Sequence, residues 1–114
     1  MRLDGNDPAA IARAADLLAQ GQLVAFPTET VYGLGARADD AEAVQKIFRS
    51  KGRPENHPLI VHIADPGAMT TFAAEVPPVA SRLTAAFWPG PLTVILPRRH
   101  GIAAHAAGHQ NSIG

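Results

Sequence analysis

The sequence lacks cysteine, net charge and any long apolar run, and each absence excludes a class of protein. Without cysteine there is no disulfide scaffold, no thiolate zinc site and no cysteine nucleophile. Lys+Arg number 10 against 10 Asp+Glu, which argues against a protein held to nucleic acid mainly by bulk electrostatics. No apolar run approaches the roughly 18 residues of a membrane span, and residues 1–4 lack the apolar stretch of a signal peptide. We therefore expect a cytoplasmic protein without a membrane segment.

The chain does contain enough apolar material for a packed core. It has 114 residues, 46% hydrophobic and 18% charged, a composition typical of one globular domain at most. The charges are unevenly placed, because no acidic residue follows Glu75 whereas Arg82, Arg98 and Arg99 do. The basic last third leaves room for a local anion site.

Helical and strand patterns alternate along the chain. Asp7 followed by Pro8 is a cap and a first helical residue, and Asp65 with Pro66 repeats the signal. Helices are predicted over residues 8–20, 40–51, 66–73 and 79–87, and strands over residues 23–26, 59–64 and 92–96. This alternation predicts an α/β fold with a mixed or mostly parallel sheet.

Three details of this prediction depend on short signals. Asp39, with Glu42 three residues on, is interpreted as the cap of the second helix. Residues 28–35 are interpreted as a strand end and a loop, and residues 59–64 as a strand covered on both faces. Residues 111–114 resemble a turn leading into a further strand, so we expect the chain to be a fragment of a longer domain.

The glycines at positions 33 and 35 match the loose dinucleotide pattern G-x-G-x-x-[GA]. In a dinucleotide site such glycines open a helix directly after a strand. Here the strand breaks at Pro27 and the capped helix begins only near Asp39, so the pattern favours a turn. No G-x-x-x-x-G-K-[ST] phosphate loop is present.

Two cations, Lys51 and Arg53, flank a glycine just beyond the second helix. Such cations are often solvated charges that interact favourably with the helix dipole, but they are also suited to binding phosphate. His62 lies inside the apolar run 59–64. It is either a hydrogen-bonded core histidine or a side chain at the mouth of the sheet that reaches a ligand.

Residues 27–35 place hydroxyls, a carboxylate and a phenol within a few positions. Read alone they form a polar strand end, but together they could make a convergent pocket for a small zwitterion. His100, His105 and His109 have no carboxylate neighbours, so they favour a mobile loop over a metal site.

Three segments together resemble the YrdC-like threonylcarbamoyl-AMP synthases. They are FPTETVYGLG at residues 26–35, KGRP at 51–54 with PLIVH at 58–62, and WPGPLT at 88–93. The resemblance covers essentially the whole chain and identifies residues 1–114 as the N-terminal portion of a YrdC-like domain. The S-x-N pair of that family has no counterpart here, and the C-terminal part of the domain is absent.

The resemblance implies an ATP-dependent nucleotidyltransferase with a twisted α/β sheet around an electropositive cavity. Such enzymes form threonylcarbamoyl-AMP and pyrophosphate from L-threonine, bicarbonate and ATP, with Mg²⁺ accompanying the nucleotide. The resemblance assigns Lys51 and Arg53 to the ATP phosphates as the catalytic pair. It further places His57 and Ser112 at the nucleotide, and Thr30 and His62 in the threonine pocket.

The product of this reaction serves a threonylcarbamoyl transferase complex that modifies N6 of an adenosine in tRNA. Three alternatives stay open beside the synthase. One is the related carbamoyl-adenylate domain of hydrogenase-maturation carbamoyltransferases, although those chains usually carry cysteines upstream. The others are a YrdC-like module that binds RNA and an inactive truncated fragment.

Overall fold

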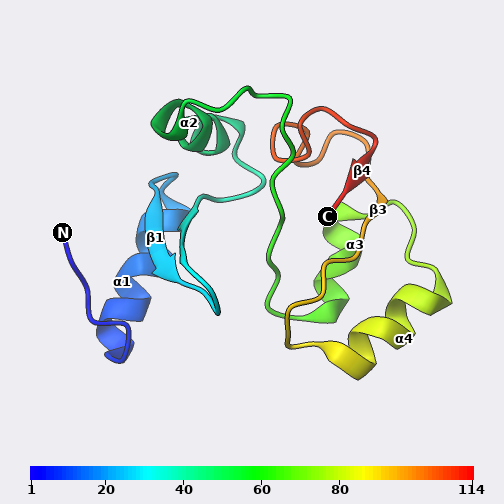
Figure 1. Cartoon of the computed structure of the whole chain (residues 1–114), viewed down its shortest axis with the longest axis horizontal. Coiled ribbons are helices and arrows are strands. Elements are labelled where there is room, and N and C mark those ends of the chain that lie inside the picture. Colours follow the sequence, from blue (N-terminus) through cyan, green and yellow to red (C-terminus); the bar gives the residue numbers. More distant parts are fainter. The chain divides into compact units, whose positions relative to one another are not determined.

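The structure, a computed structural model, describes residues 1–114 as two compact units, Met1–Arg53 and Pro54–Gly114 (Figure 1). The first unit contains α1 (Pro8–Ala19), β1 (Val24–Pro27), β2 (Tyr32–Gly35) and α2 (Ala41–Lys51). The second contains the 3-10 turn η1 (Pro66–Ala68), α3 (Met69–Phe72), α4 (Pro78–Phe87), β3 (Leu96–Pro97) and β4 (Ser112–Ile113). The predicted α/β class is confirmed. No helix is long and apolar enough to cross a membrane.

Helix α1 begins and ends where the sequence signals predict. The Asp7 carboxylate accepts a hydrogen bond from the N–H of Ala9 at 3.0 Å, and Pro8 occupies the first turn, where its missing N–H is no loss. Gly21, with φ +80°, lets the chain turn out of the helix into β1.

Strands β1 and β2 form an antiparallel hairpin, with Val24 opposite Gly35 and Pro27 opposite Tyr32. The predicted loop over residues 28–35 is therefore wrong for its second half. The two glycines make the pairing possible, because a Cβ on Gly35 would lie 2.5 Å from Cε1 of the Phe26 ring. Both glycines belong to a strand, and no helix starts at them, which excludes the dinucleotide interpretation.

Helix α2 is capped by Asp40 and not by Asp39. The Asp40 carboxylate accepts from the N–H groups of Glu42 and Ala43 at 3.1 and 3.2 Å. Asp39 instead pairs with Arg37, whose Nε lies 2.5 Å from its Oδ1. The hydrogen bond from this guanidinium lowers the pKa of Asp39. The predicted cap is therefore wrong by one residue, because Asp39 is paired with Arg37 and Asp40 makes the capping hydrogen bonds.

One face of α2 is apolar and buried. Its buried residues follow the i, i+1, i+4, i+5 spacing of a helical stripe, namely Ala43, Val44, Ile47 and Phe48. Lys46 lies beside this stripe, and its Nζ donates to the carbonyl of Gly21 at 2.8 Å. That bond holds α2 to the turn between α1 and β1.

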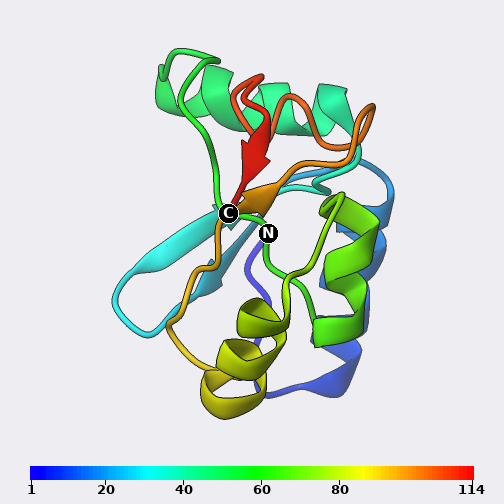
Figure 2. The same cartoon turned by 90° about the vertical axis from the view of Figure 1, so that its right-hand side faces the viewer.

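The core of the second unit forms around Met69, Ala73, Ala80 and Leu96. Four half-buried apolar side chains pack against it, those of Ile63, Val76, Trp88 and Val94. Figure 2 shows β4 beside β3, which pair antiparallel with Leu96 opposite Ile113. Both two-stranded sheets are thus antiparallel, where the sequence predicted a mixed or mostly parallel sheet.

Residues 59–64 do not form the predicted strand. The N–H of Leu59 donates to Ala106 and that of Val61 to Gly114, at 2.7 and 2.9 Å, but no carbonyl of the segment accepts a backbone bond in return. A ladder needs both directions of bonding. Alternate residues are exposed, with Ile60 at 58%, so the segment is not covered on both faces.

The C-terminal predictions need two further corrections. The predicted strand 92–96 is reduced to β3, since only Leu96 and Pro97 find a partner. That partner is β4, so residues 112 and 113 already form a strand where a turn was expected. Residues 101–109 form consecutive turns with Ala106 and Ala107 buried at 3% and 1% exposure.

Candidate active site

Lys51 and Arg53 lie where α2 ends and the chain reverses. Gly52 adopts the left-handed conformation with φ +64°, and the N–H of Arg53 donates to Phe48 at 3.1 Å. This wraps the Lys51–Gly52–Arg53 turn around the helix terminus. Both cationic side chains are exposed and neither has a hydrogen-bond or ion-pair partner. They are therefore available to an anionic ligand.

Thr30 lies on the turn that joins β1 to β2. The Oγ1 of Thr28 accepts from the N–H groups of Thr30 and Val31 at 3.4 and 3.2 Å and donates to the carbonyl of Val31. The side chains of residues 28–32 are all exposed. The turn thus presents hydroxyl groups and the Glu29 carboxylate outward from a fixed backbone.

His57 belongs to a turn closed by its own N–H, which donates to Pro54 at 3.1 Å. The turn packs against Gly108, because a Cβ there would lie 2.6 Å from the carbonyl oxygen of Asn56 and 3.0 Å from the nitrogen of Pro58. The bond from Leu59 to Ala106 continues this contact. The backbone around His57 is therefore held by residues 106–108.

His62 is exposed, so the core-histidine interpretation is excluded. Its neighbour Val61 bonds to Gly114, two residues beyond the half-buried Ser112 of β4. The segments that carry His62 and Ser112 consequently run side by side. Within the second unit the structure brings His57, His62 and Ser112 onto neighbouring segments, whereas Thr30, Lys51 and Arg53 belong to the first unit.

Two arginines of the basic last third are bound to the chain's own carbonyls. Arg98 donates to Gln110 at 2.8 Å and to Ile102 at 3.0 Å, and Nε of Arg99 donates to Thr70 at 3.0 Å. These guanidinium groups close a loop and tether it to α3. The loop holds two of the histidines, His105 and His109, with ring centroids 4.8 Å apart.

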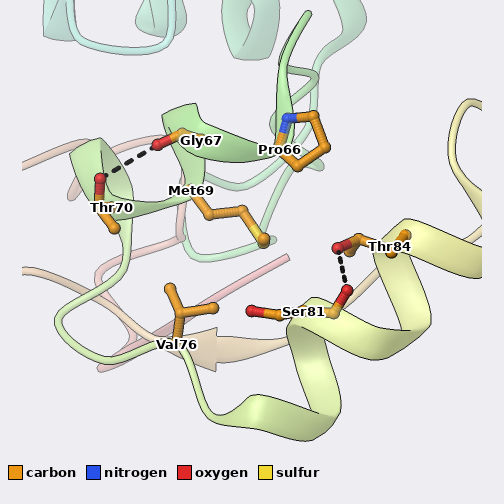
Figure 3. Close-up of a pocket in the computed structure, with 8 residues that line it drawn as sticks. Pro66, Gly67, Met69, Thr70, Val76, Ser81 and Thr84 are labelled. Carbon is orange, nitrogen blue, oxygen red and sulfur yellow. Dashed lines mark hydrogen bonds between the residues drawn. The ribbon is translucent and has the colours of Figure 1, made fainter.

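A pocket of about 330 Å³ lies between η1, α3 and α4, and no sequence motif predicted it. Figure 3 shows its lining residues, namely Pro66, Gly67, Met69, Thr70, Val76, Ser81, Thr84 and Ala85. The hydroxyl of Thr70 already donates to the carbonyl of Gly67 in η1, and that of Thr84 to the carbonyl of Ser81 in α4, each at 3.1 Å. None of the six candidate site residues contributes to this pocket.

The fold and these segments define an α/β domain with a free Lys-x-Arg pair, an arrangement suited to anionic ligands. The family model for Sua5, YciO and YrdC proteins, described as "Telomere recombination", matches residues 16–114. The chain belongs to this family, which confirms the YrdC-like resemblance.

The chain is similar to two curated proteins named threonylcarbamoyl-AMP synthase. It is 55% identical over 95 residues to that of Bacillus subtilis (strain 168), covering 83% of this chain and 27% of the relative. It is 55% identical over 85 residues to that of Pyrococcus abyssi (strain GE5 / Orsay), covering 75% of this chain and 25% of the relative.

The fold is similar to the crystal structure of P. abyssi Sua5 complexed with L-threonine. The TM-score is 0.89 at 46% identity, over 94% of this chain and 32% of that chain. This chain thus spans 27% and 25% of the two curated relatives and 32% of the chain in that crystal structure.

Proposed function

We propose that this chain carries the N-terminal part of an L-threonylcarbamoyladenylate synthase domain. The reaction converts L-threonine, bicarbonate and ATP into threonylcarbamoyl-AMP and pyrophosphate. The observation that carries the proposal is the exposed, unpaired Lys51 and Arg53 pair, in a chain whose relatives are named threonylcarbamoyl-AMP synthase.

The chemistry explains why such a pair is needed. The threonine nitrogen adds to the carbon of bicarbonate, water leaves and a proton is released, which gives a carbamate. A carbamate oxygen then attacks the α-phosphorus of ATP and the bond to the β-phosphate oxygen breaks, releasing pyrophosphate. An anion is thereby joined to an anion, so the site must neutralise charge on the attacked phosphate and on the leaving group.

Lys51 and Arg53 suit this task in different ways. The Lys51 ammonium is a compact point charge, whereas the Arg53 guanidinium is a planar fork that can bind two phosphate oxygens at once. Lys51 is the last residue of α2, and Arg53 follows it after the left-handed Gly52. Lysine and arginine are therefore not interchangeable at these two positions.

Mg²⁺ enters this scheme as part of the Mg·ATP substrate. We expect the ion to be held mainly by phosphate oxygens and water, as Mg²⁺ usually is in sites that transfer phosphate groups.

The remaining roles concern binding and positioning. We assign Thr30 and His62 to L-threonine, and His57 and Ser112 to ATP. Hydroxyl and imidazole groups can hydrogen-bond the ammonium, carboxylate and hydroxyl groups of the amino acid. Holding the amine at the right place for carbamate formation lowers the barrier by orientation more than by acid-base chemistry.

The product is a mixed anhydride of a carbamic acid and a phosphate, so a second enzyme must use it as an activated donor. We assign that step to a threonylcarbamoyl transferase complex acting on tRNA. Pyrophosphate release in this chain's reaction requires no RNA, which separates the synthase from an RNA-binding module.

The test is threonine- and bicarbonate-dependent release of pyrophosphate by the full-length gene product. Lys51→Ala and Arg53→Ala should each lower kcat/KM at least a hundredfold, the usual effect of removing one charge-stabilising donor. Arg49→Ala is the matched control, because Arg49 is exposed on the same helix, and it should change kcat/KM less than twofold. Unchanged pyrophosphate release by both site variants would refute the assignment.

A further inference from the structure

A side chain closes the turn between β1 and β2. In most such turns a backbone carbonyl accepts the closing hydrogen bond. Here the hydroxyl oxygen of Thr28 accepts from the N–H groups of Thr30 and Val31, at 3.4 and 3.2 Å. The same hydroxyl donates to the carbonyl of Val31, which also receives the N–H of Thr28 at 3.1 Å.

The side chains of the turn are not packed against the rest of this unit. Residues 28–31 are all exposed, and Val31 is 71% exposed despite its apolar side chain. With no buried side chain to anchor it, the position of Thr30 depends on the hydrogen bonds of Thr28. A polar turn of this kind is stable only while the hydroxyl competes successfully with water.

The Thr28 side chain lies close to Gly33. A Cβ added to Gly33 would lie 3.4 Å from Cγ2 of Thr28, so the methyl group faces the position that a side chain at residue 33 would occupy. A β-branched residue has few rotamers, and in the observed one the methyl group faces Gly33 while the hydroxyl faces the turn. Threonine therefore supplies two things here, a hydroxyl for the turn and a methyl group that faces Gly33.

We propose that Thr28 is a positioning residue for L-threonine binding, acting through the backbone of Thr30. The proposal rests on the proposed function, because it takes Thr30 as a threonine-binding residue. Thr28 preorganises the turn, so the amino acid meets a fixed hydroxyl and does not have to order the loop on binding. Nucleotide binding, which we assign to other segments, is independent of Thr28.

The experiment compares two substitutions of Thr28 in the full-length gene product. Thr28→Val keeps the shape and the methyl groups but removes the hydroxyl, whereas Thr28→Ser keeps the hydroxyl and removes the methyl group. Thr71→Val, at an exposed threonine of α3 with no side-chain hydrogen bond, is the control. For each protein we would measure the Kd of L-threonine by calorimetry, the KM of ATP, and the midpoint of urea unfolding.

Thr28→Val should raise the Kd of L-threonine about five- to tenfold, which corresponds to the free energy that one hydrogen bond contributes. Its KM for ATP should match that of the control, and its unfolding midpoint should fall slightly, because a hydrogen bond contributes about 1 kcal/mol to stability. Thr28→Ser should recover most of the affinity, within about threefold of the wild type, because the hydroxyl is retained.

The outcomes separate this proposal from the function on which it rests. If the wild type binds L-threonine and Thr28→Val binds it equally well, the positioning role is wrong and the synthase assignment stands. If Thr28→Val weakens the binding of L-threonine and of ATP equally, Thr28 is merely structural and the proposal is again overturned. Failure of the wild type itself to bind L-threonine overturns both.

Discussion

The substitution Gly108→Ala tests how the turn that carries His57 is held in place. Gly108 is buried and has φ +60°. A methyl group there would lie 2.6 Å from the carbonyl oxygen of Asn56 and 3.0 Å from the nitrogen of Pro58. Both atoms belong to the backbone, so neither can rotate away. The chain around His57 must move, or Gly108 must.

Two costs add at this position. Alanine in the left-handed region is less favourable than glycine by about 1–2 kcal/mol. Forcing a methyl group into an occupied space costs a further 1–3 kcal/mol, typically. Gly101→Ala is the matched control, because Gly101 has φ +80° in the same segment and nothing lies within 4 Å of its Cβ position. The control has only the conformational cost, so the difference in stability between the two variants gives the cost of the steric clash with residues 56–58.

Trp88 provides the assay. It is the only tryptophan in the chain, it is half-buried in the second unit, and its Nε1 donates to Leu92 at 2.8 Å. Urea unfolding followed by its fluorescence should give a midpoint for Gly108→Ala about 1 M below that of Gly101→Ala, given the usual dependence of stability on urea. Equal midpoints would show that residues 56–58 do not lie against Gly108, and the account of the His57 turn would fail.

Asp40→Ala should destabilise the chain by about 1 kcal/mol through loss of a helix cap, and Asp39→Ala by clearly less, in urea unfolding followed by circular dichroism. The opposite order would restore Asp39 as the cap. Arg37 lowers the pKa of Asp39 by a hydrogen bond, so this contribution to stability is present above the carboxyl's unfolded pKa and is lost as pH falls through the lowered folded value. Arg37→Gln should therefore flatten the acid limb of the stability profile slightly, and an unchanged limb would contradict the pairing. Phe48→Ala, at a side chain that is 2% exposed, should cost about 3–5 kcal/mol, and a cost below 1 kcal/mol would show that the α2 stripe is not buried.

The helices were predictable because their signals are local. The pairs Asp7 with Pro8 and Asp65 with Pro66 each place a cap next to a residue that fits only a first turn, and both helical segments begin there. The second helix shows the limit of such signals. Asp40 caps it, whereas the adjacent Asp39 forms an ion pair with Arg37, a residue outside the capping pattern.

The strands were harder to predict because a strand depends on its partner. Residues 59–64 have the composition of a buried strand, yet only two of their N–H groups find acceptors. Residues 32–35 lack strand composition, yet they pair fully with β1 because two glycines let the Phe26 ring approach. Apolar content alone does not reveal which segments will meet.

The candidate site divides in the same way. The identities of Lys51, Arg53 and His62 could be proposed from motifs, since charge and residue type are visible in the sequence. Their surroundings could not, because the same His62 was compatible with a core and with an exposed position. Sequence reasoning did not single out Thr28 or Gly108. Thr28 acts through a hydrogen bond to the backbone of the turn, and Gly108 acts through the absence of a Cβ, and neither feature is visible in a motif.

The cations that could bind a ligand are distinguished by whether their side chains already have hydrogen-bond partners, and not by charge alone. By count alone, Arg82, Arg98 and Arg99 make the last third of the chain basic, which left room for a local anion site there. The guanidinium groups of Arg98 and Arg99 bind carbonyl oxygens of the chain, so an anion would have to compete with hydrogen bonds that hold a loop together. Lys51 and Arg53 face no such competition, because both side chains are exposed and neither has a hydrogen-bond or ion-pair partner. A ligand phosphate can therefore bind them without breaking any interaction of the fold, and this is the physical reason to place the chemistry there.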